Sequence, residues 1–440
     1  MPRWHLNILV TAAVFAWGLT VQGALAQTDS FARRSRWLPW PGSLTAGLTR
    51  RAKEFQRSTK DAEERFWVGL GAVVFRAPTV LGLEARRIGM TCETCHGGGD
   101  ANRRFFLAGL SSKPRTVDLT SAVFRRANDD GRFNPIRIPS LRGIAATAPY
   151  GHRGRFATLR AITRHVIVDE FAGKPPAPKV MRALIAYLRV LKPVPNRLLD
   201  PAGRLTRAAS DQARRGQAMF TKTWPGARGR SCASCHRPAR AFTDGKAHDV
   251  GTGGRIETPS LLGAALGGPF MHDGRFERLD QAAGHYANIA GRVLTPRQRG
   301  ELVAFLHEVG AAEGADEPIT LAADLARVGS AVAILALTLK RKEPTLAGLV
   351  VVTVRRDIGR IHDRFPGAGH TQARRRLVRW SRLLQLVARA AEKKAFTRAR
   401  SALAKSLVAG RDATAALSRT AATSLYDPVR LKAFLAARRN

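Results

Sequence analysis

The pattern of apolar and polar positions predicts a mainly helical chain. Apolar residues recur three and four positions apart over long stretches, and in 372–407 they occupy one helical face while arginines occupy the other. Two nearby apolar runs, 331–339 and 346–354, are each too short to span a bilayer. We therefore expect a basic α-helical region over residues 311–440, with these two runs as its buried helices.

The first residues have the pattern of an export signal. A basic start at Arg3 is followed by a short apolar run and by small residues at Ala24 and Ala26. This pattern predicts a signal peptide over residues 1–26, and therefore a periplasmic protein. Residues 27–64 are rich in Arg, Ser and Pro, and we expect them to form a linker or an N-terminal arm.

An internal repeat occupies the middle of the chain. Each copy holds a Cys-x-x-Cys-His motif, a Pro-Ser-Leu-x-Gly segment, a His-x-Gly-Arg-Phe turn and a final apolar helix. We call Cys92–His96 the first pentad and Cys232–His236 the second pentad. The spacing from pentad to turn is about 20 residues longer in the first copy, which predicts loop insertions there. The repeat predicts two domains, 65–195 and 205–310.

The pentads carry the clearest chemistry. Two thiols three positions apart can add to the two vinyl groups of one porphyrin, and the adjacent His can ligate its iron. All four cysteines of the chain belong to the pentads, and the further Cys or paired His that a zinc site needs are not evident. The sequence predicts two covalently attached haem c groups, bound through Cys92, Cys95, Cys232 and Cys235, with His96 and His236 as iron ligands.

The ligand on the other side of each iron decides the function. An iron with two protein ligands passes electrons, whereas an open iron binds peroxide. Candidates for the first haem are His152 and His165, and those for the second haem are Met271, His272, His285 and Tyr286. Each candidate has a structural alternative as a turn or core residue, and the residues alone leave the choice open. Arg155 and Arg275, at equivalent positions of the two turns, either pair with haem propionates or lie exposed.

Composition limits the class of partner. The 440 residues include 73 Lys and Arg against 33 Asp and Glu, a formal net charge of +40. The mean hydropathy of −0.17 excludes a polytopic membrane protein. So large a positive charge attracts anionic partners. Because we expect export, we predict an acidic redox protein or an anionic envelope surface as partner, and no nucleic acid.

The pentads, the Pro-Ser-Leu-x-Gly segments and the Pro-Phe-Met-His-Asp-Gly-Arg-Phe turn together resemble the bacterial di-haem cytochrome c peroxidase and MauG family, over roughly residues 65–310. The resemblance implies two tandem cytochrome c-like helical domains, one with a peroxidatic haem and one with a six-coordinate relay haem. Family peroxidases ligate the relay haem with a Met fourteen residues after the His of this turn, and MauG-type members carry Tyr there. The position is Tyr286 here, so the resemblance implies Tyr286 as distal ligand of the second haem.

The first copy departs from the family pattern at its turn. Family peroxidases have Gln, Trp and a catalytic Glu where this chain has Tyr150, His152 and Arg160. A carboxylate that shuttles protons is thereby replaced by a cation. Serines also replace a switching His about sixteen residues beyond His96. His152 either substitutes as the catalytic acid–base residue of the first haem site or closes its iron.

Two main functions are consistent with these features. One is an exported, peroxidase-like oxidoreductase, in which electrons enter at the second haem and reach a first haem that reduces hydrogen peroxide or oxidises a protein substrate. The other is an electron-transfer cytochrome with both haems six-coordinate and the basic C-terminal region as a docking element. A third is a haem sensor whose C-terminal helices contact an anionic membrane surface.

Overall fold

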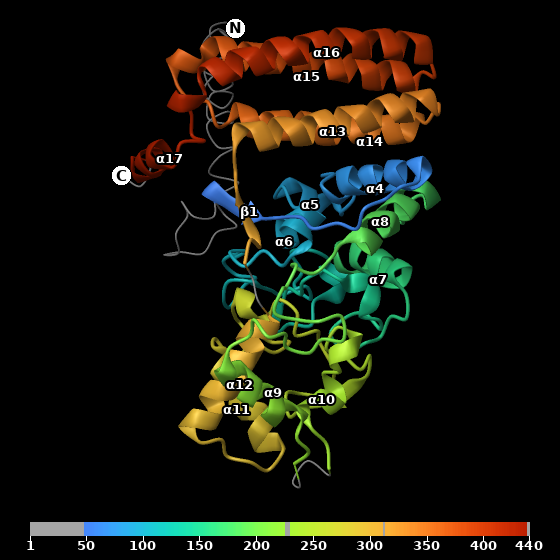
Figure 1. Cartoon of the computed structure of the whole chain (residues 1–440). Coiled ribbons are helices and arrows are strands. Elements are labelled where there is room, and N and C mark those ends of the chain that lie inside the picture. The colour runs from blue at the N-terminus through green and yellow to red at the C-terminus, as the bar shows by residue number, and fades with distance from the viewer. Residues whose placement is uncertain (1–47, 225–228, 311–312, 438–440) are drawn as a thin grey trace, which may run out of the picture.

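The computed structural model describes residues 48–224, 229–310 and 313–437 (Figure 1). Helices dominate and the strands are only two or three residues long, which confirms the mainly α prediction. The predicted signal peptide and residues 27–47 of the predicted arm lie outside the described residues. Figure 1 shows a C-terminal helix bundle, the first repeat and the second repeat following one another along the molecule.

The first repeat is built from two crossing helices and the short elements between them. In chain order these are α4 (Ala62–Phe75), α5 (Leu83–Arg87), α6 (Cys92–Cys95), β2 (Thr116–Val117), β3 (Ile136–Arg137), α7 (Leu159–His165), a π-helical turn (Val166–Glu170) and α8 (Pro178–Val190). Asp61 caps α4 by accepting the Glu64 N–H at 2.6 Å. The helices α4 and α8 approach closely because Gly71 has no side chain: a Cβ there would lie 2.0 Å from the Ala183 carbonyl oxygen.

The second repeat has the same plan. Its elements are α9 (Asp211–Thr221), α10 (Cys232–Cys235), β4 (Ala247–Asp249), β5 (Arg255–Glu257), α11 (Leu279–Ile289) and α12 (Pro296–Val309). The helices α9 and α12 cross at Gly216, where a Cβ would lie 2.0 Å from the Glu301 carbonyl oxygen. A separate core that includes Phe220, Phe242 and Phe305 fills this repeat.

Two small antiparallel hairpins occupy equivalent places in the repeats. The strand β2 pairs with β3, and β4 pairs with β5. Residues 250–254 join the second pair, whereas the much longer segment 118–135 joins the first pair. The remaining extra residues of the first copy lie between its pentad and β2. The length difference is therefore taken up in loops, as expected.

Each His-x-Gly-Arg-Phe turn is held by the other repeat. The Arg137 N–H donates to the His272 carbonyl at 2.7 Å, and the Glu257 N–H donates to the His152 carbonyl at 2.9 Å. Arg137 and Glu257 occupy equivalent positions, each two residues before the Pro of its Pro-Ser-Leu segment. The repeats thus exchange matching hydrogen bonds, and His152 and His272 both lie where the repeats meet.

The described part of 311–440 forms a helical bundle. Its elements are β6 (Asp316–Pro318), α13 (Leu321–Lys340), α14 (Pro344–His362), α15 (Thr371–Glu392), α16 (Phe396–Arg419) and α17 (Pro428–Ala436). The strand β6 pairs antiparallel with β1 (Arg50–Ala52). The helical pattern of 372–407 is divided between α15 and α16 by a turn in which Lys394 has a φ of 56°. On α15 the apolar residues Leu377, Leu384 and Val387 are fully buried.

The bundle and the first repeat share one hydrophobic core. The helix α4 packs against both α13 and α14, and the nearly buried side chains of Arg76 and Asp357 form an ion pair of 3.3 Å between the two parts. Among the described residues, α13 alone is long and apolar enough to cross a membrane, judged by length and composition. Its Val328, Leu335 and Leu339 are fully buried, so one face of α13 packs into this shared core.

Candidate haem sites

Both pentads fold as the same one-turn helix. Thr91 caps α6 and Ser231 caps α10, each through a reciprocal capping box with Thr94 or Ser234. Residues three apart in a helix share a face, so the two thiols of a pentad lie on one side. All four cysteines are free thiols, and burial raises the pKa of the Cys92 thiol to about 12. The thiols are therefore unpaired and protonated at neutral pH.

The pentad histidines are partly buried and neutral. Burial lowers the pKa of His96 to about 4, which the nearby Pro139 carbonyl only partly offsets. The buried Nδ1 of His96 has no hydrogen-bond partner among the described residues. His236 donates its Nδ1 proton to the Phe242 carbonyl at 3.0 Å, and burial lowers its pKa as well. A neutral imidazole with one nitrogen oriented by a carbonyl is the form that ligates iron.

Tyr286 lies opposite His236 in the second repeat. Their ring centroids are 6.4 Å apart and the rings are nearly perpendicular, at 87°. Tyr286 comes from α11, and burial raises the pKa of its phenol to about 12. Tyr286, which the family resemblance implies as distal ligand, therefore lies next to His236, the predicted proximal ligand.

The other candidates of the second site are engaged elsewhere or displaced. The Nε2 of His285 bonds to the Val250 carbonyl at 2.9 Å, and its ring lies on Phe276 at 5.3 Å. His272 lies in the turn between the repeats, with its Nδ1 buried and unpartnered among the described residues. Met271 occupies the same turn with a φ of 69°. Of these side chains, only Tyr286 has a ring contact with His236.

The candidates of the first site are also engaged. His152 donates its Nε2 proton to the Arg137 carbonyl at 2.8 Å, and burial lowers its pKa to about 4. His165 bonds through Nδ1 to an Asp169 carboxylate oxygen at 3.0 Å and lies on Phe156 at 4.7 Å. Among the described residues no aromatic side chain faces His96 as Tyr286 faces His236.

A carboxyl that the sequence analysis missed lies beside the first pentad. Glu170 ends the π-helical turn after α7, and its Oε1 is 3.7 Å from the Nε2 of His165. It also lies near enough to Cys95 to contribute, after burial and Cys92, to the raised pKa of that thiol. Burial raises the pKa of Glu170 itself to about 7. Glu170 lies five residues after His165, in the segment that follows the His-x-Gly-Arg-Phe turn, and this position could have identified it from the sequence.

The arginines predicted to bind propionates lie at the surface. Arg155 and Arg275 are exposed. The Nε of Arg275 donates to an Asp273 carboxylate oxygen at 2.8 Å, and the Arg155 guanidinium lies over the Phe156 ring at 5.5 Å. Both have local partners within their own turns.

Arg115, which is buried, and Arg137, which is partly buried, have the properties that we expected of Arg155 and Arg275 as partners of haem propionates. Arg115 is 2% exposed and donates only to carbonyls, those of Ile138 at 3.3 Å and Gly267 at 2.9 Å. The Nε of Arg137 is buried without a partner among the described residues. Burial lowers the pKa of Arg115 to about 9 and that of Arg137 to about 10. The sequence held one indication of this role: the alignment of the two repeats places Arg137 opposite an acid, Glu257.

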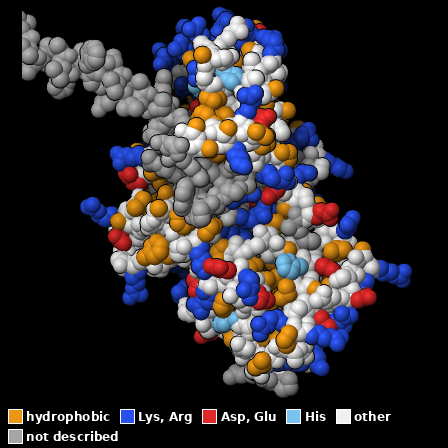
Figure 2. Space-filling model, turned by 90° about the vertical axis from the view of Figure 1, so that its left-hand side faces the viewer, with side chains coloured by type: hydrophobic (Ala, Val, Ile, Leu, Met, Phe, Trp, Pro, Cys, Tyr) orange, Lys and Arg blue, Asp and Glu red, His pale blue; other side chains and the backbone are white. Residues whose placement is uncertain are grey.

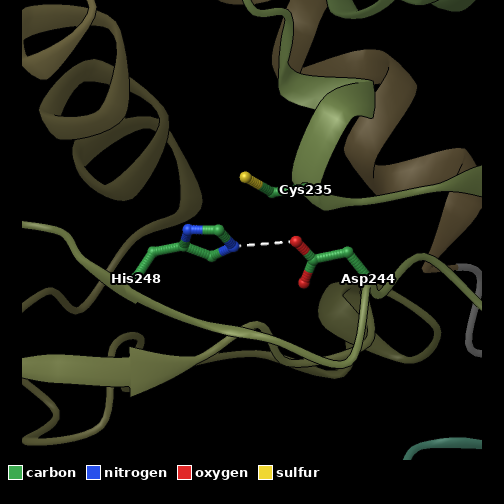
Figure 3. A group of neighbouring side chains, drawn as sticks. All are labelled: Cys235, Asp244 and His248. Atoms are coloured by element: carbon green, nitrogen blue, oxygen red, sulfur yellow. Dashed lines mark hydrogen bonds and ion pairs between the residues drawn. The ribbon is translucent and has the colours of Figure 1, made fainter.

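A carboxylate–histidine pair lies beside the second pentad. Figure 3 shows His248 and Asp244 joined by a hydrogen bond, with Cys235 next to them. The His248 Nε2 and an Asp244 carboxylate oxygen are 2.7 Å apart, and ligand atoms of the three residues lie within 4.8 Å of one another. Burial opposes ionisation of Asp244. Hydrogen bonds outweigh this effect and lower the pKa of Asp244 overall, and the hydrogen bond from His248 contributes most. Because Cys235 belongs to a pentad, we assign no separate metal site here.

The first pentad is also held from outside by the bundle. Glu93, between its two cysteines, forms ion pairs with Arg327 of α13 and with Arg360 of α14, the latter at 3.0 Å. Although burial opposes ionisation, these guanidinium groups hold the pKa of Glu93 well below its usual range. The C-terminal bundle therefore contacts the predicted haem attachment site directly.

The residues fit haem in both repeats. Each repeat offers two unpaired thiols on one helical face and a partly buried, neutral histidine. The neutral imidazoles of His96 and His236 suit a group that carries iron, and the guanidinium groups of Arg115 and Arg137 suit its carboxylates.

Comparisons with known proteins place the chain in a family. The family described as di-haem cytochrome c peroxidase matches residues 210–309. The methylamine utilization protein MauG of Methylorubrum extorquens is 32% identical over 290 residues, which cover 56% of this chain and 78% of that protein. A structure of hydrazine synthase from Kuenenia stuttgartiensis is similar with a TM-score of 0.42 and 20% identity, over 58% of this chain and 89% of that one. Because the similarity to MauG extends over most of that protein, this chain belongs to the di-haem cytochrome c peroxidase and MauG family of haem proteins.

Proposed function

We propose that the protein is an exported, periplasmic oxidoreductase with two covalently attached haem c groups. The thiols of the two pentads would hold the haems, and His96 and His236 would be their proximal ligands. Tyr286 would be the distal ligand of the second haem, which would serve as an electron relay. The first haem would keep one side of its iron free and would transfer electrons to hydrogen peroxide or oxidise a protein substrate.

The unequal surroundings of the two pentad histidines carry this proposal. His236 has Tyr286 opposite it at 6.4 Å, whereas the histidines considered for the first site are bonded to a carbonyl or a carboxylate. A bound haem supplies one-electron chemistry at iron, and an iron left open on one side also reacts with small oxidants. One open site and one closed site make an enzyme rather than a simple carrier.

Glu170 is the residue that would handle protons at the first site. It replaces, from a different position, the carboxylate that family peroxidases have where this chain has Arg160. With a pKa raised to about 7 by burial, Glu170 holds or releases a proton at neutral pH. His165, at 3.7 Å, can exchange that proton with it. His152 is less suited to the acid–base role predicted from sequence, because its Nε2 is engaged by the Arg137 carbonyl.

Arg115 and Arg137 would bind the carboxylates of the first haem. Both guanidinium groups are buried near the first pentad, while the nearest acid, Asp100, is paired with Arg142 at 3.1 Å. Buried cations of this kind are stabilised when they pair with an anion. In this assignment Arg115 and Arg137, rather than the exposed Arg155 and Arg275, bind haem propionates.

The electron donor or acceptor would be an acidic redox protein. A net charge of +40 attracts an acidic protein surface and increases the rate of encounter. Nucleic acid is excluded as a partner if the chain is exported, and the basic C-terminal region provides a possible contact with an anionic membrane surface.

The alternative is an electron-transfer cytochrome with both irons closed. The observation in its favour is Arg160, an exposed cation at the position of the family's catalytic Glu. In this case His152 would turn toward the first iron after breaking its bond to Arg137.

Hydrogen peroxide distinguishes the two functions. We would add it to the haem-loaded full chain in the ferric and half-reduced states and follow the visible spectrum by stopped flow. The proposed enzyme reacts rapidly through one haem, and Glu170→Gln slows the reaction at least about a hundredfold, whereas Glu84→Gln, at an exposed site, does not. Two haems that remain inert in both states would contradict the proposal and support the carrier.

A further inference from the structure

A cavity of about 560 Å³ lies between the first pentad, the β1–β6 pair and the helices α13 and α14. Glu93 and Thr94 of the first pentad form part of its wall, whereas Cys92, Cys95 and His96 are not among its lining residues. Figure 2 views the molecule from the side of β1 and shows Lys and Arg side chains at the boundary between the bundle and the repeats. The volume suits a small ligand.

The wall of this cavity is strongly basic. Ten arginines line it against four acidic residues, an excess of six positive charges. The acids are already used within the wall: Glu93 pairs with Arg360, and Asp324 pairs with Arg51 at 2.8 Å. Two acids outside the wall compensate part of the excess, because Glu84 pairs with Arg87 and Glu317 pairs with Arg51, and the wall remains positive overall.

Two of the arginines are free to bind a ligand. The guanidinium groups of Arg86 and Arg104 have no hydrogen-bond or ion-pair partner among the described residues. Burial and repulsion by Arg103 and Arg50 lower the pKa of Arg104, even though the Asp316 carboxylate opposes this effect. Positive charges crowded in this way repel one another until an anion is bound.

We propose that this cavity binds a small, multiply charged anion of the oligophosphate type. A guanidinium group presents its donors in a planar fork that matches phosphate oxygens, and several such forks converge here. The excess of arginines over acids in the wall favours a ligand with several negative charges over a monocarboxylate. Arg86 and Arg104 are its primary contacts, and the remaining arginines supply the surrounding positive potential.

The site is distinct from the haem chemistry, although it shares Glu93 with the first pentad. Its ligand would lie on the outer side of α6, in contact with both the first repeat and the bundle. A bound anion would therefore join the two parts through their common basic wall.

Isothermal titration calorimetry of the haem-loaded full chain with pyrophosphate at low ionic strength tests the proposal. We expect one saturable site, whose affinity falls as salt is added. The double variant Arg86→Gln/Arg104→Gln should lose at least about tenfold in affinity. The matched control, Arg299→Gln/Arg398→Gln, removes two exposed charges from other helices and should bind pyrophosphate normally.

Three outcomes would overturn the inference. The first is the absence of saturable pyrophosphate binding by the unaltered protein. The second is an equal loss of affinity in both double variants, which would indicate diffuse attraction by net charge. The third is binding to vesicles of anionic phospholipid without binding of pyrophosphate, which would assign this basic wall to a membrane surface.

Discussion

Glu93 and Arg360 form an ion pair of 3.0 Å that joins the first pentad to helix α14 of the C-terminal bundle. Arg327 of α13 pairs with the other carboxylate oxygen. The two residues are more than 250 positions apart in sequence, and the shared hydrophobic core around them is continuous. The bundle is therefore part of the structure that holds the first haem site, and not a separate tail.

Replacing Glu93 with Gln should destabilise the protein. The change leaves two largely buried guanidinium groups without their carboxylate, at a cost of about 3 kcal/mol in the free energy of unfolding. Chemical denaturation followed by circular dichroism measures the loss. Glu84→Gln removes only the exposed pair with Arg87 and should change stability by less than about 1 kcal/mol. Equal losses in both variants would show that the Glu93 contacts do not hold the bundle.

Replacing Asp244 with Asn should raise the reduction potential of the second haem. The Asp244 carboxylate is only 4% exposed and interacts electrostatically with His236. Its negative charge favours the oxidised iron, so its removal should shift the potential upward by tens of millivolts. Redox titration measures the shift. Asp249→Asn, at an exposed position of the same hairpin, should have little effect, and a comparable shift there would contradict the assignment.

Replacing Glu257 with Gln should remove a pH-dependent loss of stability. Burial raises the pKa of Glu257 to about 8 from its ordinary value of 4.5. Between these two values the folded state holds a proton that the unfolded state releases, so stability falls as pH rises through this range. The variant should therefore melt a few degrees higher than the unaltered protein at pH 8 and nearly the same at pH 5.

Thermal melts at the two pH values, with Glu277→Gln as control, test this effect. Glu277 lies at the surface, with its side chain 74% exposed, and its replacement should shift melting equally at both pH values. If Glu257→Gln gives the same shift at pH 5 and pH 8, the carboxyl is ionised normally in the folded protein.

The mainly α fold could be predicted because the spacing of apolar residues within each helix is visible in the sequence. The apolar stripe that includes Leu377 and Leu384 is buried as its spacing predicts, because helix packing requires one apolar face. The capping boxes at Thr91 and Ser231 likewise lie in the short sequences around the pentads. Spacing along the chain was enough to predict the buried helix faces, whereas the two capping boxes were not predicted.

Contacts between distant segments could not be predicted in the same way. Nothing near Glu93 in the sequence indicates that Arg327 and Arg360 will surround it. Arg155 and Arg275 were chosen as propionate partners because they are equivalent in the repeat, whereas burial, which sequence does not show, distinguishes Arg115 and Arg137. Each of these contacts depends on how the repeats and the bundle pack.

The most direct test of the account is the ferric EPR spectrum of the haem-loaded full chain, compared with that of Tyr286→Phe. Two unequal sites predict one high-spin haem and one low-spin haem in the unaltered protein. Loss of the phenol oxygen opposite His236 should abolish or shift the low-spin signal and leave the high-spin signal unchanged, while Tyr187→Phe, on α8, should alter neither. Two low-spin haems in the unaltered protein, or a low-spin signal unchanged by Tyr286→Phe, would contradict the account.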